Sequence, residues 1–311
     1  MGQMNLSVAA IVPVFNRPRA VLEGLEGVLA QTFPPAKLIV VDDGSTDETA
    51  ARVEEWLLAK RPPFEAKLIR QPNAGAAAAR NRGVVEAHGC DVYAFLDSDD
   101  IWPADYLRRM SDAFAIHPDA VAACADRVNH DFATGAVDPH SYKHYADGKC
   151  NATTLMFLEG PPGTSGVAIR ASAFHQAGGF DPAWPTGQDY DLMLRVSLLG
   201  PWHYVPGTPI TSRNHLEVVT GSGEPPLSLK YADRAFRRVQ MLHRFIFECG
   251  GRNVVPENVW RRRLSGLWFK AGRKLAAMDR PEDARDCFRR VIDLRPWHLL
   301  ARWKLLNTRG S

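Results

Sequence analysis

The sequence contains no long apolar run. None of its 311 residues belongs to a stretch approaching the roughly 20 apolar residues that a membrane-spanning helix needs. The apolar stretch near the N-terminus, residues 8–14, contains Pro13 and does not follow a basic region, unlike a secretory signal peptide. We therefore expect a cytoplasmic protein, either in solution or in peripheral contact with the inner face of the membrane.

Cysteine is scarce and never closely spaced. The chain has five cysteines, an odd number, and they lie far apart. A disulfide framework or a zinc site would require pairs at short spacing, so the sequence indicates neither. We interpret the cysteines as reduced thiols.

A strong net charge is also absent. The chain has 38 Lys and Arg against 35 Asp and Glu, and a net charge of +3 gives no reason to expect a nucleic-acid partner. The basic residues of the last third alternate with aromatic ones, which predicts either solvated helix faces or peripheral contact with anionic lipid headgroups. They are Arg237-Arg238, Arg261-Arg262-Arg263, Arg273-Lys274 and Arg289-Arg290, interleaved with Trp260, Trp268, Phe269 and Trp297.

The first hundred residues alternate short apolar runs with helical patterns, which is typical of an α/β protein with a parallel sheet. The expected strands cover residues 8–14, 38–41, 67–70 and 92–96. The expected helices follow them: one starts near Pro18 and has an apolar face between residues 21 and 29, one starts at a capping box formed by Ser45 and Glu48, and one covers residues 76–87. The pattern predicts a doubly wound, mostly parallel sheet.

The rest of the chain is predicted as follows. Residues 127–163 lack a sustained period and are interpreted as a loop region; a strand is expected at 166–170, a helix at 190–199 and a short strand near 204–205. Gly and Pro in residues 220–226 indicate a boundary, giving domains 1–224 and 225–311.

The second domain is expected to be all-helical. Within it, Gly272, Ala284, Phe288 and Pro296 have the spacing of one tetratricopeptide-like unit. A single unit cannot form a solenoid, because each unit buries its apolar face on a neighbour. The region is therefore either a helical cap on the main domain or a partner-binding module.

Polar residues follow all four expected strands of the first half. They are Asn16-Arg17, Asp42-Asp43-Gly44-Ser45, residues 73–80, and Asp97-Ser98-Asp99-Asp100. In an open α/β sheet, ligands bind beyond the carboxyl ends of the strands. We expect these loops to share one crevice.

The acidic run Asp97-Ser98-Asp99-Asp100 is the most distinctive of these loops. Carboxylates clustered at the end of an apolar strand suit Mg²⁺ or Mn²⁺, which bind one or two protein carboxylates together with substrate phosphates. The competing interpretation is an acidic turn that caps the next helix.

Taken together, the motifs resemble an inverting glycosyltransferase of family two, with a nucleotide-sugar-binding fold of the GT-A type. The resemblance spans residues 6–222. Its elements are Val12-Pro13-Val14-Phe15-Asn16, Val40-Val41-Asp42-Asp43-Gly44-Ser45-Thr46-Asp47, Asn73-Ala74-Gly75 with Ala79-Arg80-Asn81, Phe95-Leu96-Asp97-Ser98-Asp99-Asp100, Gly178-Gly179-Phe180-Asp181, Gly187-Gln188-Asp189-Tyr190-Asp191-Leu192, and Arg213-Asn214-His215 with Ser222.

The resemblance implies a role for each loop. The nucleobase would contact Pro13, Val14, Asn16 and either Asp42 or Asp43. The rest of the donor would contact Gly75, Arg80, Asp97 and Ser98. A Mn²⁺ or Mg²⁺ ion would be held by Asp97, Asp99 and His215. An arginine such as Arg80 suits a diphosphate because its planar fork binds two oxygens at once.

The catalytic base is expected at Asp189, the aspartate of the family's Glu-Asp motif. An inverting transfer needs such a base for the proton of the acceptor hydroxyl. This sequence has Gln188 where the family usually has glutamate, so Asp191 is a second candidate, unless it only caps the same helix.

The resemblance predicts transfer of a sugar from a UDP-sugar to a saccharide or lipid-linked acceptor in cell-surface glycan assembly. Residues 127–163 would then lie on the acceptor side. The alternative is a nucleotide-binding scaffold with impaired catalysis that acts through its helical region. A dinucleotide-dependent oxidoreductase is disfavoured, because Phe15-Asn16-Arg17-Pro18 replaces the glycine-rich phosphate turn.

Overall fold

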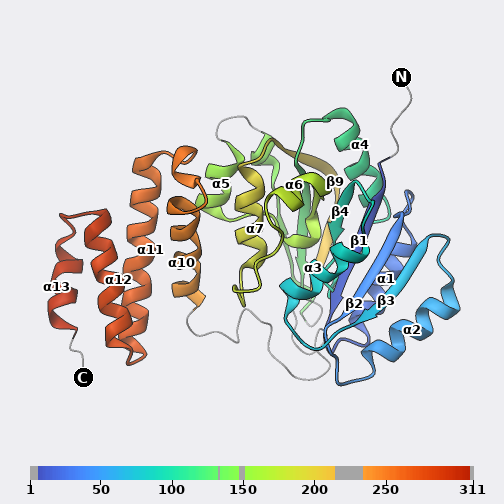
Figure 1. Ribbon diagram of the computed structural model, residues 1–311, viewed down its shortest axis with the longest axis horizontal. Helices are drawn as coiled ribbons and strands as arrows, with labels where there is room; N and C mark the ends of the chain where they lie inside the picture. The colour runs from blue at the N-terminus through green and yellow to red at the C-terminus, as the bar shows by residue number, and fades with distance from the viewer. Residues whose placement is uncertain (1–5, 132–133, 147–150, 214–233, 309–311) are drawn as a thin grey trace. The chain divides into compact units, whose positions relative to one another are not determined.

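The computed structural model describes residues 6–131, 134–146, 151–213 and 234–308. It divides the chain into two compact units (Figure 1). The first comprises residues 1–152 and 161–226, and the second comprises residues 153–160 and 227–311. The predicted border after residue 224 lies outside the described residues and stays a prediction.

The first unit is built on a nine-stranded sheet whose N-terminal half is parallel. The strands β3, β2, β1 and β4 are neighbours in that order, with β1 and β2 in register from Ala9 beside Lys37 to Val14 beside Asp42. Their bounds are β1 (Val8–Val14), β2 (Lys37–Asp42), β3 (Glu65–Arg70) and β4 (Val92–Phe95). The four predicted strands are thereby confirmed to within two residues.

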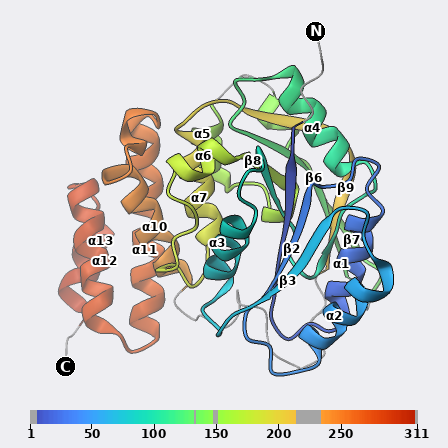
Figure 2. The same ribbon diagram turned by 45° about the vertical axis from the view of Figure 1, so that its right-hand side comes forward.

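Helices cover both faces of this sheet (Figure 2). One face carries α1 (Ala20–Leu29), α2 (Thr49–Lys60) and α4 (Tyr106–Ile116), and the other carries α3 (Ala76–Glu86), α6 (Ala171–Gln176) and α7 (Gln188–Ser197). Because side chains alternate between the two covered faces, all seven residues of β1 are buried. This is why β1 appears in the sequence as an uninterrupted apolar run: helices cover the strand on both faces of the sheet.

Helix α3 lies very close to the central strand at Gly83. A Cβ atom at this position would collide with Cγ2 of Ile11 and approach Cγ2 of Val41 to 3.4 Å. Ile11 is fully buried in β1, so its branched side chain has little room to move. A residue without a side chain is therefore needed where the helix crosses the sheet.

We expect Gly83→Ala to destabilise the first unit by about 1–2 kcal/mol. The overpacking cost of about 1–3 kcal/mol exceeds the gain of up to about 1 kcal/mol in helix propensity. Chemical denaturation of both proteins measures the change. Gly266→Ala is the matched control, because a Cβ there meets nothing within 4 Å and should stabilise its helix. An equal gain in the free energy of unfolding for Gly83→Ala and Gly266→Ala would contradict the close approach of α3 to β1.

The downstream half of the sheet is mixed, with antiparallel pairs β4–β8, β8–β6, β6–β7 and β9–β5 and a parallel pair β6–β9. Its strands are β8 (Val167–Arg170), β6 (Ala122–His130), β9 (Trp202–Arg213), β5 (Asp100–Ile101) and β7 (Val137–His140). The α/β class with helices after the sheet is confirmed. The parallel arrangement holds for the first four strands and for the β6–β9 pair, and the other pairs are antiparallel.

Residues 127–163 are not the predicted loop region. They include the end of β6, all of β7, a short 3₁₀ helix (Lys143–Ala146) and α5 (Ala152–Glu159). The end of β6 and all of β7 are only partly buried and carry polar side chains, so the alternation of apolar and polar residues that would reveal a strand is lost. The same effect hid most of β9, which was expected only near residues 204–205.

Two expected helix starts are also corrected. Helix α2 begins at Thr49 rather than at the box of Ser45 and Glu48, because Ser45 Oγ accepts the Asn16 N–H at 2.9 Å. Helix α1 begins at Ala20, after Pro18. Ser45 thus serves a contact between two loops instead of capping a helix.

In the part of the chain that the structure describes, the second unit contains most of α5 and four further helices, each of which packs against the next one along the chain. They are α10 (Arg234–Phe247), α11 (Glu257–Ala277), α12 (Pro281–Leu294) and α13 (Leu299–Asn307), with a 3₁₀ turn at Gly251–Asn253. Among the described residues, no helix is both long and apolar enough to cross a membrane.

The core of this unit corrects one expectation about lipid contact. Trp260 and Trp268 are buried inside the helical unit, so they cannot reach headgroups between the arginines. Gly272 faces the ring of Phe288, which lets α11 and α12 pack closely as a hairpin. That hairpin has the form expected of a tetratricopeptide-like unit, which itself stays a prediction.

Candidate active site

The loops after β1 and β2 brace each other at the carboxyl end of the sheet. The Asn16 amide oxygen accepts the Thr46 N–H at 2.9 Å, and the Asn16 N–H donates to Ser45. Asn16 has a positive φ of 50°, a conformation that Asn adopts more readily than most residues. Pro13 and Val14 are buried in β1 just before this loop. The side chain predicted to contact a nucleobase is therefore partly committed to holding the loop.

The two candidate carboxylates of the second loop differ in how they are bonded. Asp43 accepts the N–H groups of Ala74 and Gly75 at 2.9 and 2.8 Å and also a side-chain N–H of Gln71. Asp42 Oδ1 accepts the Ser45 N–H, while its buried Oδ2 has no hydrogen-bond partner among the described residues and lies 3.7 Å from Arg70 Nε as an ion pair. Asp43 fixes the turn that carries Gly75, whereas Asp42 Oδ2 has room for one further hydrogen bond beside that ion pair.

The acidic run follows β4 directly, and two of its carboxylates face arginines. Asp97 Oδ1 lies 2.5 Å from Arg80 Nη2, and Asp99 Oδ2 lies 3.0 Å from Arg17 Nη1. Ser98 between them is buried. The interpretation of the run as a helix cap is not supported, since α4 begins only at Tyr106 and has no side-chain cap.

Burial makes the run unfavourable for several negative charges at once. The pKa of Asp99 is raised by burial and by the charge of Asp97, against the opposing effect of Arg17. The pKa of Asp100 is raised to about 8 by burial and then by the charges of Asp99 and Asp97. A cation placed beside these carboxylates would relieve the repulsion.

The exposed carboxylate oxygens of the run have the chemistry of Mg²⁺ or Mn²⁺ ligands. Among the described residues, no three His, Cys, Asp or Glu side chains converge on one point. Asp97 Oδ2 accepts no hydrogen bond from the described part of the chain, and its side chain is 33% exposed. One or two such oxygens, completed by water and phosphate, are the usual protein share of a Mg²⁺ or Mn²⁺ site. The third expected ligand, His215, lies outside the described residues.

Arg80 is a buried cation with unused donors. Its Nε and Nη1 atoms have no hydrogen-bond partner among the described residues, and its guanidinium lies 5.2 Å from the centre of the Phe180 ring. Burial alone would lower the pKa of Arg80, but the charges of Asp97, Asp189 and Asp99 raise it above its ordinary value. Arg80 therefore stays charged, and two of its nitrogen atoms have no hydrogen-bond partner among the described residues.

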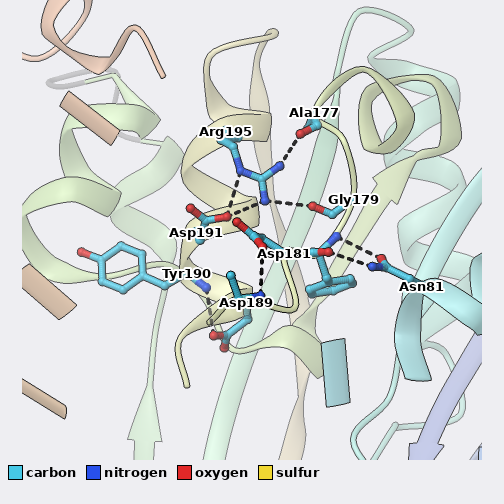
Figure 3. Close-up of polar contacts among 10 residues, drawn as sticks. Asn81, Ala177, Gly179, Asp181, Asp189, Tyr190, Asp191 and Arg195 are labelled. Carbon is cyan, nitrogen blue, oxygen red and sulfur yellow. Dashed lines mark hydrogen bonds and ion pairs between the residues drawn. The ribbon is translucent and has the colours of Figure 1, made fainter. Parts of the chain in front are cut away.

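The carboxylates of α7 have different environments (Figure 3). Asp191 is 2% exposed and forms an ion pair with Arg195 at 2.5 Å. Arg195 also donates to the carbonyl oxygens of Ala177 and Gly179, so this pair holds α7 to the preceding loop. Asp191 does not cap the helix, and its burial and its ion pair with Arg195 leave it poorly placed to act as a base.

Asp189, by contrast, is only half-buried and has a polar neighbour. Its Oδ1 accepts the N–H of Tyr190, and its Oδ2 accepts the Thr164 hydroxyl at 3.3 Å. Its charge also acts on Arg80. The structure thus brings Asp189, Arg80 and Asp97 into one electrostatic neighbourhood.

Three residues that the sequence reading did not assign complete this neighbourhood. Arg17 pairs with Asp99, Thr164 bonds Asp189, and Ser165 Oγ accepts the Asp97 N–H at 3.0 Å. Thr164 and Ser165 belong to one short 3₁₀ turn, so a single segment contacts both the acidic run and the candidate base. The signal for Arg17 was its place in the polar loop after the first strand, and the signal for Thr164 and Ser165 was the cluster of Gly, Pro, Ser and Thr in residues 160–166.

The loop before α7 is held against α3 by a side chain. Asn81 donates to the Phe180 carbonyl at 2.7 Å and accepts the Phe180 N–H at 3.0 Å. Gly179 has a φ of 71°, and a Cβ there would lie 3.0 Å from the Asn81 amide oxygen. The Gly178-Gly179-Phe180-Asp181 motif therefore positions Phe180 beneath Arg80.

A family model described as glycosyl transferase family 2 matches residues 9–164, which include the acidic run, Arg80 and Arg17. The chain belongs to this family. It is thus a glycosyltransferase by family, and the resemblance predicted from the motifs is confirmed.

Individual relatives agree with this assignment. The chain is 25% identical over 286 residues to the putative colanic acid biosynthesis glycosyl transferase WcaA of Escherichia coli, covering 88% of this chain and 97% of the relative. Several other curated relatives are longer, and the chain spans about a third of their length.

Solved structures show the same fold at low identity. S. aureus TarS residues 1–349, in complex with UDP-GlcNAc, matches with a TM-score of 0.72 and 16% identity, covering 97% of this chain and 89% of that one. The mannosyltransferase PcManGT of Pyrobaculum calidifontis, in complex with GDP-Man and Mn²⁺, matches with a TM-score of 0.57 and 16% identity, covering 98% and 88%. These matches confirm the GT-A type of fold predicted for the family-2 chain.

Proposed function

We propose that this chain is a metal-dependent, inverting glycosyltransferase that transfers a sugar from a UDP-sugar to a hydroxyl of a saccharide or lipid-linked acceptor in glycan assembly. The observation that carries the proposal is the buried Arg80 with two unused N–H donors, next to Asp97 and within the field of Asp189. A buried cation with free donors is suited to an anionic ligand such as a diphosphate.

Donor binding is assigned to the carboxyl-end loops of β1, β2 and β4. Asp42 Oδ2 is the buried acceptor available for a nucleobase N–H, and Arg80 faces the diphosphate. Asp97 and Asp99 would hold Mn²⁺ or Mg²⁺, which neutralises the charge of a leaving diphosphate when bound. The complexes of TarS with UDP-GlcNAc and of PcManGT with GDP-Man and Mn²⁺ support this use of the fold.

The chemical step is assigned to Asp189. The oxygen of the acceptor hydroxyl forms a bond to the anomeric carbon while the bond from that carbon to the diphosphate oxygen breaks. The hydroxyl proton passes to the Asp189 carboxylate, and the diphosphate leaves with the electron pair of the broken bond. Thr164 keeps the carboxylate oriented through its hydrogen bond to Oδ2.

Release of the nucleoside diphosphate tests the assignment. The full chain is incubated with Mn²⁺ and, in separate reactions, UDP-GlcNAc, UDP-glucose, UDP-galactose and GDP-mannose, and free UDP or GDP is measured. We expect turnover with a UDP-sugar that stops with chelator and falls about a hundredfold or more in Asp99→Asn, because the carboxylate's share of charge stabilisation is lost. Asp119→Asn, an exposed aspartate, should turn over at the parental rate.

Each other outcome has a defined meaning. If only GDP-mannose is turned over, the proposed donor changes from a UDP-sugar to GDP-mannose and the proposed reaction stays the same. Manganese-dependent UDP binding without turnover on a broad acceptor panel would favour the scaffold alternative. Full turnover in chelator would contradict the metal assignment.

A further inference from the structure

Helix α13 presents an apolar face to solvent instead of to the protein. Leu299, Trp303 and Leu306 are 78%, 54% and 82% exposed, and their spacing of four and three residues places them on one side of the helix. Ala301, on the opposite side, is fully buried. Trp297, just before the helix, is 89% exposed. These four exposed side chains of the second unit are called here the α13 face.

The α13 face is held in a fixed orientation. Arg285 of α12 donates to the carbonyl oxygens of Leu305 and Thr308 at 3.1 and 2.9 Å, which fastens the C-terminal end of the helix. At the other end, His298 Nδ1 accepts the Ala301 N–H, and Arg302 Nε donates to the Pro296 carbonyl at 2.8 Å. The exposed side chains therefore belong to a packed helix whose inner side is already occupied.

The segment that bears this surface contains positive charge and no negative charge. Residues 295–311 contain four cations and no aspartate or glutamate. The cations are Arg295, Arg302, Lys304 and Arg309. Lys304 Nζ lies 5.1 Å from the centre of the Trp303 ring, so charge and aromatic surface are in direct contact. Tryptophan and leucine beside lysine and arginine are the composition of helices that lie in a membrane interface.

A basic depression adjoins the start of this segment. It has a volume of about 490 Å³ and is lined by Asn258, Arg261, Arg262 and Arg295. Arg261 is bonded to Glu257 at 2.6 Å, but Arg262 and Arg295 form no ion pair among the described residues. Because Arg295 stands two residues before Trp297, unpaired cations and the apolar face follow each other along one short stretch of chain.

We propose that the α13 face docks on an anionic lipid surface, with Leu299, Trp303 and Leu306 in the acyl boundary and the flanking arginines and Lys304 on headgroup phosphates. In this arrangement, the burial of apolar side chains and the attraction of the cations to anionic lipids both contribute to the free energy of membrane binding. A second copy of the chain is disfavoured as the occupant, since two α13 segments, neither of which contains an aspartate or glutamate, would bring their cations together. The proposal is independent of the proposed glycosyl transfer.

Vesicle binding of the full chain tests the proposal. The fraction that sediments with unilamellar vesicles of phosphatidylglycerol and phosphatidylcholine is compared with the fraction bound to phosphatidylcholine alone. We expect binding to the anionic vesicles that weakens as salt is raised. Trp303→Gln/Leu306→Gln should lower the partition coefficient at least tenfold, because two apolar side chains no longer enter the bilayer. Its thermal unfolding should be unchanged, since both side chains are exposed.

The matched control is Leu58→Gln/Ile116→Gln, which removes two residues that are also highly exposed but lie on α2 and α4. This control should bind vesicles as the parent does. Equal partition of both double variants, or equal binding to neutral and anionic vesicles, would overturn the proposal. Loss of a dimer in Trp303→Gln/Leu306→Gln by light scattering would overturn it in favour of a second copy.

Discussion

Asp189→Asn is expected to lower kcat by about a hundredfold to ten-thousandfold and to leave the UDP affinity unchanged. The amide keeps the shape of the carboxylate and still accepts the Thr164 hydroxyl, but it cannot take the acceptor proton. Steady-state kinetics with the donor found to be active measure kcat, and calorimetry measures UDP binding. The base contacts the acceptor and not the nucleotide. Loss of the base should therefore leave the Kd for UDP unchanged.

Asp191→Asn separates the two candidates for the base. This change breaks a buried ion pair and leaves Arg195 with an unpaired charge, so we expect a loss of stability of about 3–5 kcal/mol. The fraction that remains folded should retain most of its kcat. The assignment would be reversed if Asp191→Asn abolished turnover at parental stability while Asp189→Asn remained active.

Arg80→Lys is expected to raise the donor KM about tenfold to a hundredfold. Lysine keeps the positive charge near Asp97 but loses the planar fork, and with it the second hydrogen bond to a diphosphate. Hydrogen bonds to charged groups contribute about 1.5–3 kcal/mol each, which corresponds to this range. Donor titrations in the turnover assay provide the measurement.

Arg82→Lys is the matched control for Arg80. Arg82 lies on the same helix, is largely exposed and pairs with Glu86 at 2.8 Å across one helical turn. Its replacement should change neither KM nor stability measurably, because exposed pairs contribute little. If Arg80→Lys bound UDP as tightly as the parent, the unused donors of Arg80 would not serve the diphosphate.

The parallel half of the fold was predictable because its signals are local. β1 and β2 are buried on both sides and read as unbroken apolar runs, and each ends at a loop marked by Asn16 or by Asp42-Asp43-Gly44. The mixed half depends on pairing between distant segments. β9 pairs with β6 about 80 residues earlier, for example Trp202 beside Ala122, and polar residues in both strands hide the period.

The candidate site likewise contains residues that the sequence predicts and residues that only the structure reveals. Asp97, Asp99, Arg80 and Asp189 stand in motifs and were predicted from the sequence. Arg17 and Thr164 became candidates only through contacts made across the fold. From the sequence, Asp42 and Asp43 were equal candidates for the nucleobase, while Asp191 was a second candidate for the base behind Asp189. The structure adds contacts that distinguish them, since both oxygens of Asp43 accept N–H groups and Oδ2 of Asp191 is paired with Arg195.

Calorimetric titration of the full chain with UDP, in Mn²⁺ and in chelator, tests the central claim that Asp97, Asp99 and Arg80 form a metal-assisted diphosphate site. We expect UDP to bind at least tenfold more tightly with Mn²⁺ than without it, and Asp99→Asn to lose that difference. UDP binding of equal strength in Mn²⁺ and in chelator, unchanged in Asp99→Asn, would contradict the claim.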